Sequence, residues 1–280
     1  GVVIALCLPK TAWPPTWMCC GLNDANMFFQ GYSGLGQIID RAVAQYPDRL
    51  AVVSDGNRLT YRAFNEQISR FALTLQRDGV RPGDPVAIVS RNCVEFLIAE
   101  FAVLKLGGVV VKINWRSAPD ELIHLLEFNQ VRYAVVRYER RDWGLQVYKR
   151  LRDHIHFYLI NQGTHSADSF WEAIDRAPPA DQFTPHAVEA DAPALRVHTS
   201  GTTGRAKCVI HTHGAMLRQL RNCLSVLGFE PGCVFQMTSQ LFHIACVAAY
   251  LTFAVGGTLV LMSRFEVSEY LSVFGQESVS

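Results

Sequence analysis

The residues best suited to chemistry lie in one short segment, where hydroxyl side chains and glycines are followed by two cations. Residues 199–204 read Thr-Ser-Gly-Thr-Thr-Gly, and Arg205 and Lys207 come directly after them. Glycines allow backbone N–H groups to turn towards a bound anion, and hydroxyl groups add hydrogen-bond donors. A lysine supplies a point charge for phosphate. The segment therefore predicts a loop that binds a polyphosphate, although a flexible surface turn can have the same composition.

The residues around the loop exclude a Walker A motif. That motif needs Gly-Lys-Ser/Thr at the start of a helix, whereas Lys207 is followed by Cys-Val-Ile, which is typical of a strand. Residues 195–198, before the loop, are also typical of a strand. The pattern predicts two short strands joined by a phosphate-binding loop.

The order of residues from 199 to 207 resembles the signature loop of the adenylate-forming superfamily. This superfamily includes acyl-CoA synthetases, luciferases and the adenylation domains of peptide synthetases, and His211-Thr-His213 is similar to its acyl-CoA synthetase branch. The resemblance implies that the loop binds the β- and γ-phosphates of ATP while a carboxylate attacks the α-phosphate. Ala206 stands where proline is usual, which loosens the loop, and Cys208 stands where glycine is usual, which adds a side chain beside the phosphates.

A second match to the same branch lies further along the chain, at Gln240-Leu-Phe-His243 and at Gly256-Gly-Thr-Leu-Val260. The resemblance implies that His243 lines the acyl pocket near the channel for the pantetheine arm. A histidine beside an apolar helix is alternatively a hydrogen-bonded core residue, and both interpretations stay open. The residues that the resemblance assigns to ATP are Thr199, Ser200, Gly201, Thr202, Thr203, Gly204 and Lys207.

No catalytic residue and no metal ligand are assigned within the chain. His198, His211 and His213 are close together in sequence, as zinc ligands often are. No cysteine or carboxylate completes such a site at ligand spacing, so a metal centre is not expected.

Composition narrows the class of protein. The chain has 280 residues, of which 49% are hydrophobic and 18% charged, which predicts a globular fold with a sizeable core. The net charge of +1 and the lack of a Lys/Arg run make nucleic-acid binding unexpected. The eight cysteines form no Cys-x-x-Cys pair, which indicates reduced thiols and a cytoplasmic protein.

Strands and helices alternate through much of the chain. Strand-like runs lie at 85–90, 109–113, 133–136 and 157–160, and helical patterns lie at 94–106, 119–128 and 169–177. The helix at 94–106 is apolar on nearly every face, so we expect it to be buried. Asp55-Gly56 predicts a hairpin and Thr60 a helix cap. This alternation predicts an α/β fold with doubly wound, mostly parallel sheets.

We expect three parts along the chain. Residues 1–26 have no periodicity and no charged region before their apolar start, so they are interpreted as an extension rather than as part of the domain or a signal peptide. Residues 27–193 are the expected first α/β subdomain, and 107–114 also resembles the adenylate-forming fold, with Lys112 where proline is usual. Residues 194–280 are the expected start of a second, truncated subdomain that carries the hairpin.

The stretch 231–263 contains no Asp, Glu, Lys or Arg. It could be interpreted as a membrane span, but Gly256-Gly257 divides it into pieces too short to cross a bilayer as a helix. We expect it to be buried core, with no transmembrane segment.

The resemblance implies an AMP-forming acid–thiol ligase that uses ATP, Mg²⁺ and coenzyme A and acts on a carboxylic acid, such as a fatty or medium-chain acid. An amino-acid or aryl-acid adenylation domain is the alternative within the class, and a non-catalytic nucleotide-binding remnant is the alternative outside it. The 280 residues contain no Tyr-Gly-x-Thr-Glu segment for adenine and Mg²⁺ and no Thr-Gly-Asp segment for ribose. We therefore expect the isolated chain to be an incomplete N-terminal part without activity.

Overall fold

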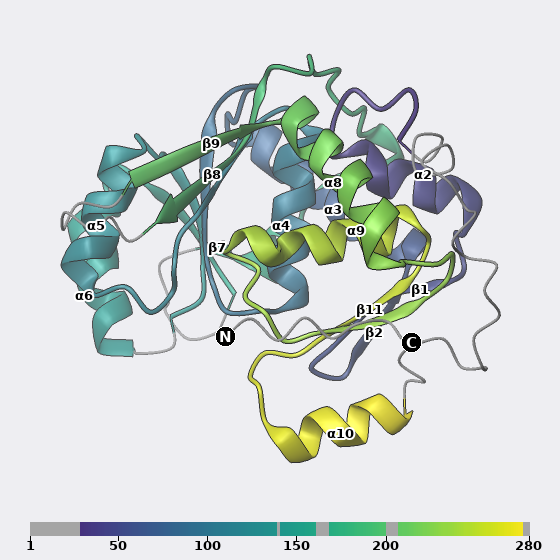
Figure 1. The fold of residues 1–280 in the computed structure, drawn as a ribbon. Coiled ribbons are helices and arrows are strands. Elements are labelled where there is room, and N and C mark those ends of the chain that lie inside the picture. The colour runs from purple at the N-terminus through teal and green to yellow at the C-terminus, as the bar shows by residue number, and fades with distance from the viewer. Residues whose placement is uncertain (1–28, 139–140, 161–167, 200–206, 277–280) are drawn as a thin grey trace, which may run out of the picture.

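Two sheets, with helices between and around them, carry the described part of the chain (Figure 1). The computed structural model describes residues 29–138, 141–160, 168–199 and 207–276. One sheet has seven strands in the order β7-β6-β5-β3-β4-β8-β9, and the other has four in the order β10-β11-β1-β2. The expected extension, residues 1–26, lies outside the described residues.

The seven-stranded sheet is parallel except for its last pair, β8 and β9. Side chains alternate between its two faces: Val86 and Ile88 belong to one core, whereas Ala87 and Val89 belong to the other. The expected α/β fold with mostly parallel, doubly wound sheets is confirmed. The strands are β3 (Pro85–Val89), β4 (Val109–Lys112), β5 (Tyr133–Val136), β6 (His156–Leu159), β7 (Asp168–Ser169), β8 (Pro193–Thr199) and β9 (Lys207–Thr212).

The four-stranded sheet joins the start of the domain to its far end. β1 (Leu50–Ser54) and β2 (Asn57–Thr60) form the expected hairpin, with positive φ angles of 47° at Asp55 and 82° at Gly56. β1 also pairs in parallel with β11 (Thr258–Leu261), which pairs in turn with β10 (Val234–Met237). The charge-free stretch therefore packs against the first strand of the domain.

The helices divide between two cores. The larger core takes side chains from α2 (Gln37–Gln45), α3 (Tyr61–Arg77), α4 (Val94–Lys105), α7 (Phe170–Asp175), α8 (His213–Leu227) and α9 (Val247–Ala254). The smaller core lies beneath α5 (Pro119–Phe128) and α6 (Arg141–Leu151), on the other face of the seven-stranded sheet. α10 (Val267–Gln276) lies apart from the other helices (Figure 1).

Local signals account for several of these elements. All twelve residues of α4 are buried, as its apolar pattern predicted. The side chain of Thr60 accepts a hydrogen bond from the Ala63 N–H (3.2 Å), which confirms the predicted cap of α3. Thr212 caps α8 in the same way through the Ala215 N–H (3.2 Å).

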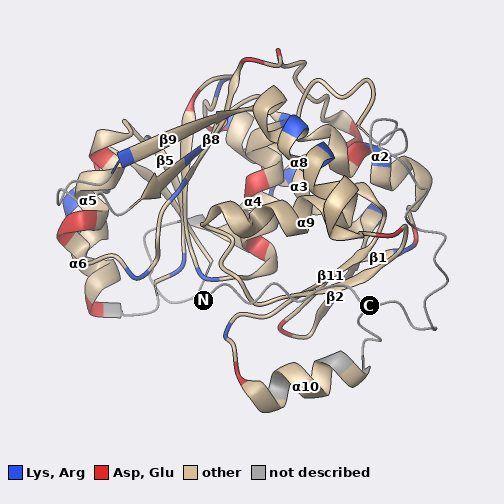
Figure 2. Cartoon of the chain, viewed as in Figure 1, with Lys and Arg blue, Asp and Glu red and all other residues tan. Residues whose placement is uncertain are grey.

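The stretch without charged side chains is divided among β10, the short helix η3 (Ile244–Cys246), α9 and β11. α9 has eight residues, most of them buried, and Figure 2 draws it without charged residues. Among the described helices, none combines the length and apolar character needed to cross a membrane. Most of the stretch is buried core, as expected, with exceptions such as the exposed His243.

The expected division at residues 193/194 does not coincide with a change of sheet. β8 pairs in parallel with β4, with Lys112 opposite Val197, so the β8–β9 hairpin extends the sheet that began at β3. A division into subdomains 27–193 and 194–280 stays a prediction. A second 3₁₀ helix, η2 (Ala180–Gln182), lies in the proline-rich connection before β8.

Candidate functional site

The β8–β9 hairpin fixes where the predicted phosphate loop begins and ends. Thr199 and Lys207 are opposite each other in the antiparallel ladder, so the chain leaves and rejoins the sheet at one point. Lys207 is exposed there, and its ammonium group is available to an anion. The remaining residues assigned to ATP lie outside the described residues: Ser200, Gly201, Thr202, Thr203 and Gly204.

The hairpin loop lies at the carboxyl edge of the parallel strands. Because β4 and β8 run in parallel, the residues that follow β4 emerge beside Thr199, at the end of β8. Open α/β sheets bind ligands at this edge. The residues after β4, notably Trp115 and Arg116, therefore belong to the same region as the loop.

His198, one residue before the loop, is held on both sides. A backbone carbonyl can only accept a hydrogen bond, so Nδ1–H of His198 donates to the Lys112 carbonyl oxygen (3.2 Å). Its Nε2 then accepts from the Asn129 side-chain amide (2.9 Å). Burial lowers the pKa of His198 below its usual value, which favours this neutral form. His198 thus anchors the base of the loop to β4 and to the end of α5.

The other two histidines of the segment have different surroundings. His213 is buried at the start of α8, and its Nδ1 accepts a hydrogen bond from the Leu35 N–H (3.2 Å). Burial lowers the pKa of His213 to about 4. His211 lies on β9, half-buried. Within the part of the chain that the structure describes, no three His, Cys, Asp or Glu side chains form a group suited to a metal ion, and we assign no residue to Mg²⁺.

A second segment, residues 239–246, reaches the same edge from the other sheet. Asn92, after β3, donates from its amide to the Ser239 carbonyl oxygen (2.9 Å) and accepts from the Leu241 N–H (2.9 Å). Lys112 Nζ donates to the Leu241 carbonyl oxygen (3.0 Å). Trp115 Nε1 donates to Gln240 Oε1 (3.1 Å). We call this set of three side chains, Asn92, Lys112 and Trp115, the clamp.

His243 follows the clamped residues directly. It precedes η3, its N–H donates to the Gln240 carbonyl oxygen (3.1 Å), and its side chain is exposed. The role of His243 in an acyl pocket stays a prediction.

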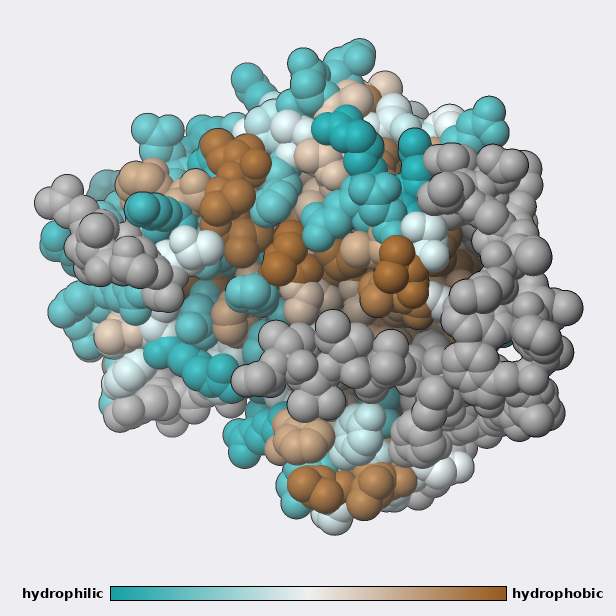
Figure 3. Space-filling view, viewed as in Figure 1, coloured by the Kyte–Doolittle hydropathy of each residue, from teal (hydrophilic) through white to brown (hydrophobic). Residues whose placement is uncertain are grey.

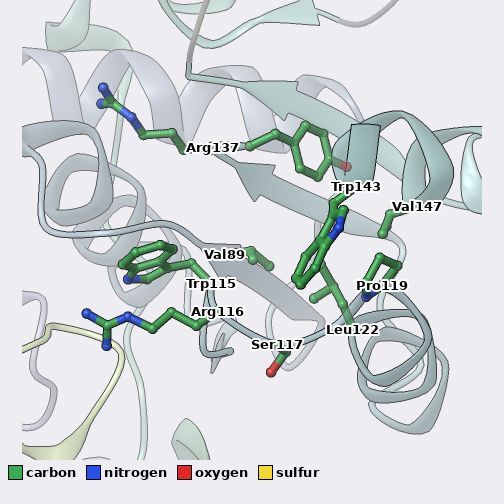
Figure 4. A pocket seen from close by; sticks show the side chains of 10 residues that line it. Val89, Trp115, Arg116, Ser117, Pro119, Leu122, Arg137, Trp143 and Val147 are labelled. Carbon is green, nitrogen blue, oxygen red and sulfur yellow. The ribbon is translucent and has the colours of Figure 1, made fainter. Parts of the chain in front are cut away.

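A cavity of about 200 Å³ opens at the same edge, and none of the sequence patterns predicted it. In Figure 4 the indoles of Trp115 and Trp143 lie on opposite sides of Val89, and the guanidinium groups of Arg116 and Arg137 lie on the Trp115 side. The Arg116 guanidinium lies 4.5 Å from the centre of the Trp115 ring. Aromatic and basic residues directly after β4 and β5 are the signal that could have indicated it.

Comparisons with known proteins point to one enzyme family. A family model described as AMP-binding enzyme matches residues 39–279. The chain is 31% identical over 259 residues to a medium/long-chain-fatty-acid–CoA/3-oxocholest-4-en-26-oate–CoA ligase of Mycolicibacterium smegmatis, covering 84% of this chain and 46% of the relative. It is 28% identical over 255 residues to a crotonobetaine/carnitine–CoA ligase of Salmonella paratyphi B, covering 86% and 48%.

A solved structure agrees as well. The inhibitor-bound N-terminal domain of FACL13 from Mycobacterium tuberculosis superposes with a TM-score of 0.79 at 25% identity, covering 89% of this chain and 62% of that one. The chain spans about half the length of the curated relatives it matches. The relatives are acyl-CoA ligases, and the resemblance of the chain to the adenylate-forming enzymes is confirmed. The assignment of residues 199–207 to ATP stays a prediction. The chain belongs to the family of AMP-binding enzymes.

Proposed function

We propose that the chain carries the phosphate-binding and acid-binding parts of an AMP-forming acid–thiol ligase. In the first half-reaction a carboxylate oxygen attacks the α-phosphorus of ATP, and pyrophosphate leaves with the electron pair of the broken P–O bond. In the second, the thiolate of coenzyme A attacks the acyl carbon, and AMP leaves. The observation that carries the proposal is the meeting of the β8–β9 hairpin and the segment 239–246 at one sheet edge.

The hairpin loop is the proposed site for the β- and γ-phosphates. Nucleotidyl transfer depends mainly on positioning and charge neutralisation. Lys207 supplies a charge, and Thr199, Ser200, Gly201, Thr202, Thr203 and Gly204 supply hydroxyl and backbone donors. Mg²⁺, when bound, neutralises further phosphate charge. His198 holds the base of the loop against β4.

The segment 239–246 is the proposed acid-binding side. His243 is exposed beside apolar Phe242 and Ile244, which supports a contact between His243 and an acid that approaches the loop. An apolar acid, such as a fatty acid, fits these neighbours best, and the name of the M. smegmatis relative supports the same class.

The cavity between Trp115 and Trp143 is the proposed site for the nucleotide end of coenzyme A. Adenine stacks well on indole rings, and arginine pairs with phosphate. Trp115 also contacts Gln240, so a ligand here would lie next to the acid-binding segment.

We further propose that the 280 residues alone bind ATP weakly and form no acyl-adenylate. Partners for adenine and ribose are not assigned within them, and an incompletely assembled site loses positioning that contributes several kcal/mol. Apolar side chains are exposed over β9 and α10 (Figure 3), including Ile210 at 56% and Leu271 at 63%. Such surfaces favour association or poor solubility.

Acid-dependent exchange of labelled pyrophosphate into ATP tests the proposed function. The assay uses the longest polypeptide that the source gene encodes around these residues, with fatty, aryl and amino acids as substrates. We expect exchange with fatty acids above all. ATP binding without exchange in any acid would instead support a nucleotide-binding remnant, and exchange with the amino or aryl acids alone would support an adenylation domain of that class.

A second assay separates the coenzyme A site from the ATP site. Arg116→Ala should raise the KM for coenzyme A about tenfold, since it removes a charged partner, while the exchange reaction, which does not involve coenzyme A, keeps its rate. An unchanged KM would remove the cavity from the proposal without affecting the loop.

A further inference from the structure

Lys112 is a fully buried cation in the middle of the molecule. It is the last residue of β4, and its side chain has no exposed surface. Its ammonium group forms an ion pair with Glu100 Oε1 of α4 at 2.5 Å and donates to the Leu241 carbonyl oxygen at 3.0 Å. Burying an ammonium group is costly unless it is paired and hydrogen-bonded.

The groups around Lys112 keep it charged. Burial acts to lower the pKa of Lys112, but the neighbouring Cys246 and Glu100 hold the pKa above its usual value. Burial raises the pKa of the Cys246 thiol, and Glu100 forms the ion pair with the Lys112 ammonium group. The Tyr250 hydroxyl of α9 donates to the same Glu100 oxygen. α4, β4 and α9 therefore meet at one buried ion pair.

Lys112 also contacts both parts of the proposed site. Its carbonyl oxygen accepts the hydrogen bond from His198, one residue before the phosphate loop. Its ammonium group holds Leu241, two residues before His243. The main chain and the side chain of one residue thus connect the two segments.

We propose that Lys112 is a positioning residue, which sets the position of residues 241–243 relative to His198 on β8. Only the expected change in KM rests on the proposed function, because the placement of residues 239–246 can be measured without turnover. Lys112 touches no reacting atom in this proposal. Lys112 holds Leu241 by a hydrogen bond, and the position of Leu241 determines where His243 meets the acid.

A second buried lysine offers a matched control. Lys105, at the end of α4, pairs with Asp40 and donates to Asn65 Oδ1 at 2.6 Å. Its side chain is 2% exposed and so nearly as buried as that of Lys112, but none of these partners belongs to the hairpin or to the segment 239–246. Substituting either lysine should lower the stability of the whole fold. Only the substitution of Lys112 should alter the placement of residues 239–246.

The test variant is Lys112→Met/Glu100→Gln, which removes both charges together and leaves an acceptor for the Tyr250 hydroxyl. Replacing a buried ion pair as a unit is often tolerated, whereas removing one partner is strongly destabilising. Lys105→Met/Asp40→Asn is the control, and the all-apolar Lys112→Leu/Glu100→Leu is the second test variant.

Hydrogen exchange measured by mass spectrometry is the first readout. We expect residues 239–246 to exchange about tenfold faster in the test variant, the effect of losing a hydrogen bond of about 1.4 kcal/mol, with no such change in the control. Equal rates in the test variant and in the wild type would overturn the proposal. In the wild type, residues 239–246 should exchange as slowly as α4. Rapid exchange of these residues in the wild type would overturn the proposal, even if neither test variant folds.

Kinetics give the second readout. In the polypeptide that supports pyrophosphate exchange, the KM for the acid should rise about tenfold in the test variant, because a misplaced contact weakens positioning, while the KM for ATP changes less than about twofold. A wild-type protein without acid-dependent exchange would refute the proposed function and leave the hydrogen-exchange result standing. An unchanged KM for the acid in a folded test variant would contradict the role of Lys112.

Discussion

The β8–β9 hairpin and the segment 239–246 meet at one edge of the seven-stranded sheet, but they are attached to it differently. The hairpin is held by its backbone ladder, which ends at the pair Thr199 and Lys207. The segment follows β10 of the four-stranded sheet and includes η3. It is held by the clamp, whose side chains lie on β4 or directly after β3 and β4 of the seven-stranded sheet. One region is thus fixed by strand pairing and the other by three polar side chains.

This difference determines what substitutions should do. A backbone ladder does not depend on a particular side chain, so residues at its open end can change without loss of stability. A clamp of buried or half-buried side chains depends on each member, because losing one leaves polar groups without partners. Hairpin variants should therefore separate ATP chemistry from stability, whereas clamp variants should affect both acid binding and stability.

The largest effect is expected at the hairpin. Lys207→Ala should lower acid-dependent pyrophosphate exchange by about 100-fold or more, because it removes one preorganised charge or donor. Thr202→Val should also lower the exchange rate. The midpoint of thermal unfolding should stay unchanged, because Lys207 is exposed. Lys149→Ala, an exposed lysine on α6, is the control. Wild-type exchange in both hairpin variants would remove the loop from the proposed site.

The next effect concerns the clamp. Asn92→Ala should lower the free energy of unfolding by about 2–3 kcal/mol, because the Leu241 N–H loses its acceptor in a buried position. Urea unfolding measures the change, with Asn222→Ala on the exposed face of α8 as control. A loss no larger than in the control would mean that the segment is held by other contacts.

The hairpin continues into α8, and His213 there makes the stability depend on pH. The folded pKa of about 4 is below the usual 6.5, so the unfolded chain binds more protons between these values and stability falls as the pH drops through this window. From pH 7 to pH 5 the loss from His213 should be about 2 kcal/mol. Urea unfolding of the wild type and of His213→Gln measures it, and equal pH slopes in the two proteins would contradict the assignment.

A smaller effect is expected at His243. His243→Ala should raise the KM for the acid about tenfold, as for a lost polar contact of about 1.4 kcal/mol, with little change in the midpoint of thermal unfolding because the side chain is exposed. A large loss of thermal stability with unchanged kinetics in the folded fraction would favour the core interpretation of this histidine.

Local sequence patterns predicted the structural features that depend on residues close together in the chain. The buried α4, the Thr60 cap and the alternation of strands and helices follow from periodicity and from single residue types. The parallel pairing of β1 with β11 could not be predicted in this way, because it joins residues about 200 positions apart, such as Val53 and Val260. α6 and α10 were also missed, since neither has an apolar face as regular as that of α3.

The candidate site shows the same division between local and distant information. The hairpin around the loop was predicted from residues 195–210, all close in sequence. The clamp was not predicted, because Asn92 and Lys112 find their partners only when the two sheets come together. A lysine in an apolar strand indicates that a buried group pairs with its ammonium, but the local sequence does not reveal which residue supplies that group.

Labelling with an ATP derivative that carries an acyl group on its γ-phosphate tests the central claim directly, in the longest polypeptide that the source gene encodes around these residues. The amine of a lysine beside the bound phosphate attacks the acyl carbon, an amide forms and ATP leaves, and mass spectrometry identifies the lysine. We expect Lys207 to be labelled about tenfold more than the exposed Lys149, through proximity, and excess Mg²⁺–ATP to suppress the difference. Labelling of Lys207 that equals that of Lys149, or that excess ATP does not reduce, would contradict a phosphate site at the hairpin.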